Sequence, residues 1–101
     1  MEEYRYFVYI LLNKSRTVFY TGVTNSLTKR VYKHRNNLTK GFTAKYNVKA
    51  LLYYEIFRDI NLALAREKQI EGGSRKKKLE LIESMNKDME DLYLKCKNLA
   101  I

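Results

Sequence analysis

The chain has 101 residues, 46% of them hydrophobic and 31% charged, with a formal net charge of +9. These values are ordinary for a soluble globular protein, and they predict a single domain over residues 1–101 with a modest core. The absence of a long apolar run, a signal-peptide pattern and a second cysteine excludes a membrane partner and an exported disulfide protein, so we expect a cytoplasmic location.

The positive charge is concentrated in the first half of the chain. Residues 4–54 contain ten Lys and Arg residues and no Asp or Glu, whereas the remainder carries ten basic and all eleven acidic residues. Such an excess creates a positive field, and a polyanion is its usual partner. We therefore expect a nucleic acid as partner, with a solvated basic surface as the alternative.

The N-terminal part predicts a β-hairpin. Residues 5–12 and 17–23 are rich in β-branched and aromatic side chains, and a polar connector separates them. A loop with an even number of residues would place Tyr9 and Tyr20 on one face of the sheet, whereas an odd loop or a bulge would separate them. Gly22 is expected to leave room for a phosphate beside Tyr20.

A helix is predicted over 27–37, with three candidate N-caps at 24–26. Its buried stripe is expected to contain the apolar residues at helical spacing, Leu27, Val31 and Leu38. Arg30 and His34 lie four residues apart and are expected to flank this stripe near its edge with solvent.

Residues 38–49 predict a basic loop, and the apolar run 50–57 predicts a third strand that is central or buried. Phe42 and Tyr46 alternate with lysines in the loop. Such a mixture suits contacts with a nucleic acid, although packing over the core is an equal alternative.

A second helix is predicted over 61–71, with Asp59 and Asn61 as caps and two glycines at its end. Glu67 shares a face with two apolar positions, Ala63 and Ile70, and is therefore expected to turn toward the core. A buried carboxylate needs a partner. A metal ion and a salt bridge are equal alternatives, the salt bridge being to Arg66, Lys68 or a residue of the sheet.

Ser74 is expected to cap a third helix over 75–86, and residues 88–97 predict a last helix or turn beyond a core of about 4–86. The basic cluster Arg75–Lys78 occupies the first turn of the third helix, where the helix dipole disfavours positive charge. The cluster therefore indicates an external anion, with a solvated surface run as the alternative.

Several kinds of active site are excluded. One histidine and one cysteine cannot build a structural zinc site, no phosphate loop has the required spacing, and the first half offers no acid for a Ser-His-Asp triad. The remaining set suits phosphodiester hydrolysis. Glu67 can hold a hard cation such as Mg²⁺, and Arg30 can stabilise phosphoryl oxygens. A tyrosine with a lowered pKa can act as general base, with His34 accepting or relaying the proton.

The chain resembles the GIY-YIG nuclease superfamily, and more narrowly the small stand-alone bacterial GIY-YIG proteins of the UPF0213-like family. The stretches that carry the likeness are YFVYILLN, FYTGVTNSLTKRVYKHR, LLYYE and LAREKQIEGGSRKKKLELI. The first motif here is Phe7-Val8-Tyr9, without the glycine of the family motif. Val23 stands where many relatives carry lysine.

The resemblance implies an α/β fold of the α+β type, with a three-stranded antiparallel sheet (the hairpin plus a third strand) and three or four flanking helices. It also implies a DNA endonuclease with one divalent ion, Mg²⁺ or Mn²⁺, acting in DNA repair or processing, with RNA as the alternative substrate. Tyr9 and Tyr20 would be the motif tyrosines, one a general base and the other positioning water or phosphate. Arg30 would stabilise the phosphate, His34 would assist proton transfer, and Glu67 would hold the metal.

Two alternatives remain beside the nuclease. The chain is either a catalytically silent nucleic-acid-binding module or a module that needs a partner protein for specificity, docking on Arg75–Lys78. In each case we expect basic and aromatic side chains to contact nucleic acid, namely Lys29, Lys33, Arg35, Lys40, Lys45, Tyr46, Arg75 and Lys76.

Overall fold

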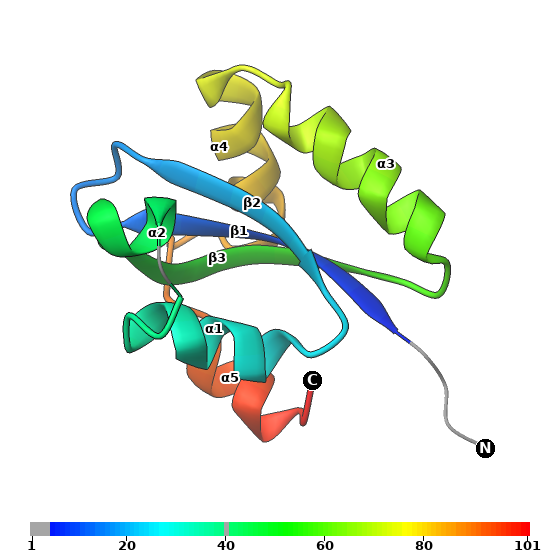
Figure 1. Cartoon of the computed structure of the whole chain (residues 1–101). Coiled ribbons are helices and arrows are strands. Elements are labelled where there is room, and N and C mark those ends of the chain that lie inside the picture. Colours follow the sequence, from blue (N-terminus) through cyan, green and yellow to red (C-terminus); the bar gives the residue numbers. More distant parts are fainter. Residues whose placement is uncertain (1–4, 40) are drawn as a thin grey trace.

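The computed structural model describes residues 5–39 and 41–101. An antiparallel three-stranded sheet carries helices on both faces (Figure 1), which confirms the predicted fold class. The elements in chain order are β1 (Tyr6–Asn13), β2 (Phe19–Thr24), α1 (Leu27–Arg35), α2 (Phe42–Lys45), β3 (Val48–Phe57), α3 (Ile60–Glu71), α4 (Arg75–Met85) and α5 (Tyr93–Asn98). None of the helices in the described ranges has the length and apolar character needed to span a membrane.

The strand order is β2-β1-β3, so the first strand is central and the third lies at an edge. The expectation that the third strand could be central is therefore wrong. The sequence of β3 is an apolar run because helices cover both faces of the sheet. Apolar content alone therefore does not distinguish an edge strand from a central one.

Alternate residues of β1 enter two separate cores. One core, formed with α1 and α5, contains Phe7, Tyr9 and Leu11. The other, formed with α3 and α4, contains Val8, Ile10 and Leu12. Figure 1 shows the two helix layers on opposite sides of the sheet. A side chain on α1 therefore shares a face with Tyr9, whereas α3 packs in the opposite layer.

The hairpin loop is organised by the side chain of Asn13. Its Oδ1 accepts hydrogen bonds from the backbone amides of Thr17 (2.8 Å) and Val18 (2.9 Å). The resulting register pairs Tyr9 with Gly22 and Leu11 with Tyr20. Six residues, an even number, separate the paired Leu12 and Phe19. Because directly paired residues share a face, Tyr9 and Tyr20 lie on the same face.

Helix α1 ends at Arg35, two residues before the predicted end. Asn37 adopts a left-handed backbone with φ 54°, which cannot continue a helix. Leu38 consequently lies outside the helix and is 63% exposed, so its predicted place in the buried stripe is wrong. His34 takes that place beside Leu27 and Val31.

The caps of the next two helices are local and were predictable. The Asp59 side chain accepts a hydrogen bond from the amide of Asn61 at 2.8 Å, and the Ser74 side chain accepts one from the amide of Lys77 at 3.1 Å. Both satisfy amides that a helix start leaves without partners. Asn61 itself lies inside α3, so its predicted capping role is wrong.

The last helix, α5, starts at Tyr93, later than the predicted start at 88. The buried amide of Asn86 holds the preceding segment in an irregular conformation. It donates to the carbonyl oxygen of Leu52 at 3.1 Å and accepts from the amide of Glu90 at 3.0 Å. These bonds compete with helical hydrogen bonding over this segment.

Candidate active site

A buried hydrogen-bonded pair forms the centre of the candidate site. The Tyr9 hydroxyl on β1 lies 3.3 Å from Nε2 of His34 on α1. The other ring nitrogen, Nδ1, lies 2.9 Å from Oγ1 of Thr43 and 3.1 Å from Oγ1 of Thr39. Both nitrogens of the imidazole therefore have hydrogen-bond partners, so the buried ring leaves no polar atom unsatisfied.

His34 is only 3% exposed, so the expectation that it lies near solvent is wrong. The physical reason is its pair of hydroxyl partners, Thr39 and Thr43, which the sequence analysis missed. Thr43 belongs to the short helix α2, within a stretch that predicts only a loop. The neighbouring aromatics that alternate with lysines are the one signal that this stretch packs against the site.

Tyr9, Tyr20 and His34 form a cluster of three rings, and Tyr20 is its outer member. Its ring is half-buried, with its centroid 6.2 Å from that of Tyr9 and 5.4 Å from that of His34. On the other side it contacts Phe42 of α2, at 6.4 Å between centroids. Tyr20 is thus the motif tyrosine that reaches the surface, whereas Tyr9 is 1% exposed.

Gly22 is required by the packing of Tyr9. A Cβ atom at position 22 would lie 2.6 Å from the Tyr9 hydroxyl oxygen and 2.7 Å from its Cζ. Real Cβ atoms do not approach so closely, so the aromatic ring lies directly over the glycine. The expectation that Gly22 leaves room for a phosphate is therefore wrong, because Tyr9 fills that space.

The charge of Arg30 acts on this cluster. Burial and the nearby guanidinium of Arg30 lower the pKa of His34. Burial, followed by the neighbouring Tyr20, raises the pKa of Tyr9 despite the opposing effect of Arg30. The expected lowering of a tyrosine pKa is wrong for Tyr9, because desolvation outweighs the arginine. At neutral pH, His34 is neutral and Tyr9 is protonated.

The lowered pKa of His34 predicts a pH-dependent stability. The unfolded chain takes up a proton near the ordinary histidine pKa of 6.5, whereas the folded chain resists protonation. The free energy of unfolding should therefore decrease as the pH falls below about 6.5, through the lower pKa of the folded state. Because His34 is the one histidine in the sequence, denaturant unfolding at several pH values isolates its effect. A His34→Gln variant should lose this slope, and an unchanged slope would contradict the assignment.

Glu67 lies on α3 between the buried residues Ala63 and Ile70 and is itself half-buried. The expected salt bridge with Arg66 does not form, because Arg66 pairs with Glu55 at 2.8 Å. Burial and then the like charge of Glu71, one turn further along α3, raise the pKa of Glu67. Among the described residues, no hydrogen bond, ion pair or ring contact joins Glu67 to Tyr9, Tyr20 or His34.

The carboxylates on α3 fit a hard divalent cation. No group of three or more His, Cys, Asp or Glu side chains suited to a metal occurs in residues 5–39 and 41–101. Mg²⁺ needs only one or two carboxylates, since waters and substrate phosphates complete its shell. Glu67 and Glu71 repel each other in the absence of a cation, and a cation between them would relieve that repulsion.

The predicted nucleic-acid contacts fall into two groups. Lys29 and Lys33, together with Arg30, line a shallow pocket of about 140 Å³ at the start of α1. Lys45 lies over the ring of exposed Tyr46, 5.3 Å from its centroid. No ion pair joins these lysines to a carboxylate within the described residues.

Other predicted contacts have structural roles or other positions. Arg35 pairs with Asp91 and lies 4.7 Å from the ring centroid of Tyr93. Arg75 donates to the carbonyl oxygen of Thr17 at 3.1 Å and to that of Arg16. The side chain of Lys76 is exposed on α4, and Lys40 lies outside the described residues.

A family model described as the GIY-YIG catalytic domain matches residues 5–80 of the chain. The chain belongs to the GIY-YIG family. Among similar GIY-YIG proteins, the UPF0213 protein CPE1444 of Clostridium perfringens is 38% identical over 78 residues, which cover 77% of this chain and 83% of that protein. The UPF0213 protein YazA of Bacillus subtilis is 31% identical over 98 residues, covering 97% and 98% of the two chains.

A solved structure of another UPF0213 protein is also similar to this chain. The solution NMR structure of the UPF0213 protein BH0048 from Bacillus halodurans matches with a TM-score of 0.55 and 26% identity. The match covers 86% of this chain and 92% of that protein. The predicted resemblance to small UPF0213-like GIY-YIG proteins is therefore confirmed.

Proposed function

We propose that the chain is a metal-dependent endonuclease that hydrolyses phosphodiester bonds in DNA, with a role in DNA repair or processing. The observation that carries the proposal is the cluster of Tyr9, Tyr20 and His34 on one face of the sheet, under the field of Arg30. A protein that only binds nucleic acid needs no buried tyrosine–histidine pair. Membership in the GIY-YIG family supports the same reaction class.

Burial separates the roles of the two tyrosines. Half-buried Tyr20 can reach the attacking water or the phosphate, whereas Tyr9 and His34 are too deeply buried to touch substrate. The Tyr9 hydroxyl shares a hydrogen bond with Nε2 of His34, and the Thr43 hydroxyl shares one with Nδ1 of the same ring. Tyr9 and His34 are therefore positioning residues that hold the ring of Tyr20 and the local protons in place.

The charged groups supply the electrostatic part of the reaction. Exposed Arg30 would bind the non-bridging oxygens of the scissile phosphate, where negative charge grows in the transition state. Glu67, with Glu71 beside it, would hold Mg²⁺ or Mn²⁺. Such an ion, when bound, supplies charge neutralisation at the phosphate and the leaving oxygen.

A plasmid-nicking assay with increasing Mg²⁺ tests this function. The wild-type chain should nick supercoiled DNA only with metal, and Tyr20→Phe should reduce the rate about a hundredfold, because it removes a hydroxyl that takes part in proton transfer. Tyr32→Phe is the matched control, since Tyr32 lies on α1 and is 51% exposed. Equal nicking by wild type and Tyr20→Phe would refute the proposal.

A second candidate function is a nucleic-acid-binding module without turnover. Phe42 and Tyr46 favour it, because their rings contact each other at a tilt of 52°, with centroids 4.9 Å apart, and remain 48% and 42% exposed, which leaves ring surface for bases to stack on. Such a module would bind with steep salt dependence, and metal would change nothing. A module that needs a partner protein would instead nick DNA only when that partner, docked on Arg75–Lys78, is added.

A further inference from the structure

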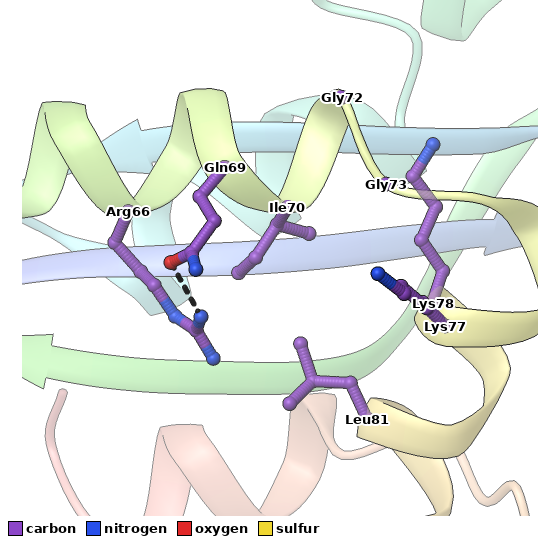
Figure 2. A pocket seen from close by; sticks show the side chains of 8 residues that line it. All are labelled: Arg66, Gln69, Ile70, Gly72, Gly73, Lys77, Lys78 and Leu81. Atoms are coloured by element: carbon purple, nitrogen blue, oxygen red, sulfur yellow. Dashed lines mark hydrogen bonds between the residues drawn. The ribbon is translucent and has the colours of Figure 1, made fainter.

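A second pocket lies away from the tyrosine cluster, between the end of α3 and the start of α4. Its volume is about 340 Å³. Figure 2 shows Arg66 and Gln69 entering it from α3, and Lys77 and Lys78 extending from α4. No Asp or Glu is among the residues that line it, although the second half of the chain carries most of the acidic residues.

The two lysines of this pocket bring uncompensated positive charge. In residues 5–39 and 41–101, no ion pair joins Lys77 or Lys78 to a carboxylate. Lys78 has a contact with the ring of Phe19, with its Nζ 5.9 Å from the ring centroid. The helix dipole further disfavours cations in the first turn of α4, so the charge does not serve to stabilise the helix.

The α3 side of the pocket adds hydrogen-bond donors. Arg66 is held by Glu55, with Nε 3.0 Å and Nη2 2.8 Å from the carboxylate oxygens. Its Nη1 donates to Oε1 of Gln69 at 2.8 Å, the bond drawn in Figure 2. Because Gln69 uses its oxygen as an acceptor, its amide NH₂ group remains available to a ligand. Two cations and an amide donor around one cavity suit an anion with several oxygens.

The pocket adjoins the candidate active site through one side chain. Lys78 also lines a smaller pocket of about 190 Å³, which contains Tyr20, Phe42 and Glu71. The two pockets therefore share Lys78 as a lining residue. An anion in the larger pocket would lie next to the pocket that contains Tyr20.

We propose that the α3–α4 pocket binds a phosphate group, and that in the complex with substrate this group is a backbone phosphate flanking the scissile one. The role as a flanking phosphate site rests on the proposed function, whereas phosphate binding by the pocket does not. A free phosphate compound has the same chemistry, so the experiment needs one arm for each source.

The first arm uses inorganic phosphate and requires no catalysis. In an NMR titration, phosphate should shift the amide signals of Gly72, Gly73 and Lys77. Lys77→Ala should weaken this binding about tenfold, as expected for the loss of a charge-assisted hydrogen bond. Lys68→Ala is the matched control. It removes the same charge from α3, at an exposed residue that does not line the pocket, and should change the affinity less than twofold.

The second arm uses a single-stranded or duplex oligonucleotide with the Glu67→Gln variant, so that binding is measured without cleavage. Adding Lys77→Ala should reduce the slope of log K against log salt by about one, and neutral methylphosphonate linkages beside the central phosphate should erase the difference between the two variants.

Equal slopes, with phosphate still bound in the first arm, would overturn the flanking-phosphate role and assign a free phosphate compound. If phosphate shifts no pocket amide, or Lys68→Ala weakens binding as much as Lys77→Ala, the pocket is not a phosphate site. Phosphate binding in a chain that never nicks DNA would refute the proposed nuclease function and leave the pocket standing.

Discussion

Replacing Glu67 with glutamine is expected to reduce plasmid nicking at least about a hundredfold, equivalent to roughly 2.7 kcal/mol of transition-state stabilisation. Glutamine keeps the shape of the side chain but cannot supply the negative charge that holds a hard cation. The melting temperature should not fall. Glu67 contributes no ion pair within the described residues, and its charge is opposed by that of Glu71. Nicking rates and thermal unfolding of the same preparation measure both effects.

Glu83→Gln provides the matched control for this experiment. Glu83 is exposed on α4 and loses the same charge without touching the candidate site. Its nicking rate should equal that of the wild type. Equal losses in the two variants would show that net charge, rather than a specific carboxylate, controls activity, and the metal-binding role of Glu67 would be wrong.

A Gly22→Ala variant should lose about 1–3 kcal/mol of stability, together with most of the nicking activity. The added methyl group would meet the ring of Tyr9 at 2.6–2.7 Å, and that ring is held in place by His34 and by the core of the α1 face. Tyr9 has to move, and its movement breaks the contact with His34. Denaturant unfolding and the nicking assay together measure the damage.

A double-mutant cycle distinguishes this clash from a general effect of alanine in a strand. Tyr9→Leu removes the two closest atoms that the new methyl group would meet, the third being Cε2 of Tyr20 at 3.0 Å. In that background, Gly22→Ala should cost much less than it does alone, because the two sites are coupled by direct contact. Additive losses would show that the packing of Tyr9 is not the reason for glycine at this position.

The parts of the fold that depend on local sequence were predictable. The caps Asp59 and Ser74 act on amides within three residues of themselves, so a short sequence pattern is enough to identify them. The same holds for the hairpin, whose loop is organised by one asparagine side chain. The position of β3 was not predictable, because strand order depends on contacts between segments far apart in the chain.

In the candidate site, too, the features set by local sequence were predictable and those set by distant contacts were not. Tyr9 and Tyr20 follow from strand alternation once the loop length is known, and the register places them on one face. The burial of His34 does not follow from α1 alone. It depends on the hydroxyl groups of Thr39 and Thr43, which come from beyond the helix and lack a characteristic spacing. The failure of Arg66 to pair with Glu67 was equally hidden, because Arg66 pairs with Glu55 of the sheet instead.

The central position of β1 also determines which parts of the site open first in local unfolding. The backbone amides of β1 lie between two neighbouring strands and are covered by the two cores. Their hydrogen exchange should therefore require opening of the whole molecule. The four-residue helix α2, which carries Thr43, lies at the surface and can open by itself. Local opening of α2 would remove Thr43 from Nδ1 of His34 and leave Thr39 as its partner, while Tyr9 stays in register. Tyr9, on the central strand, is therefore expected to be the most protected member of the site, and the contact of His34 with Thr43 the one most readily lost.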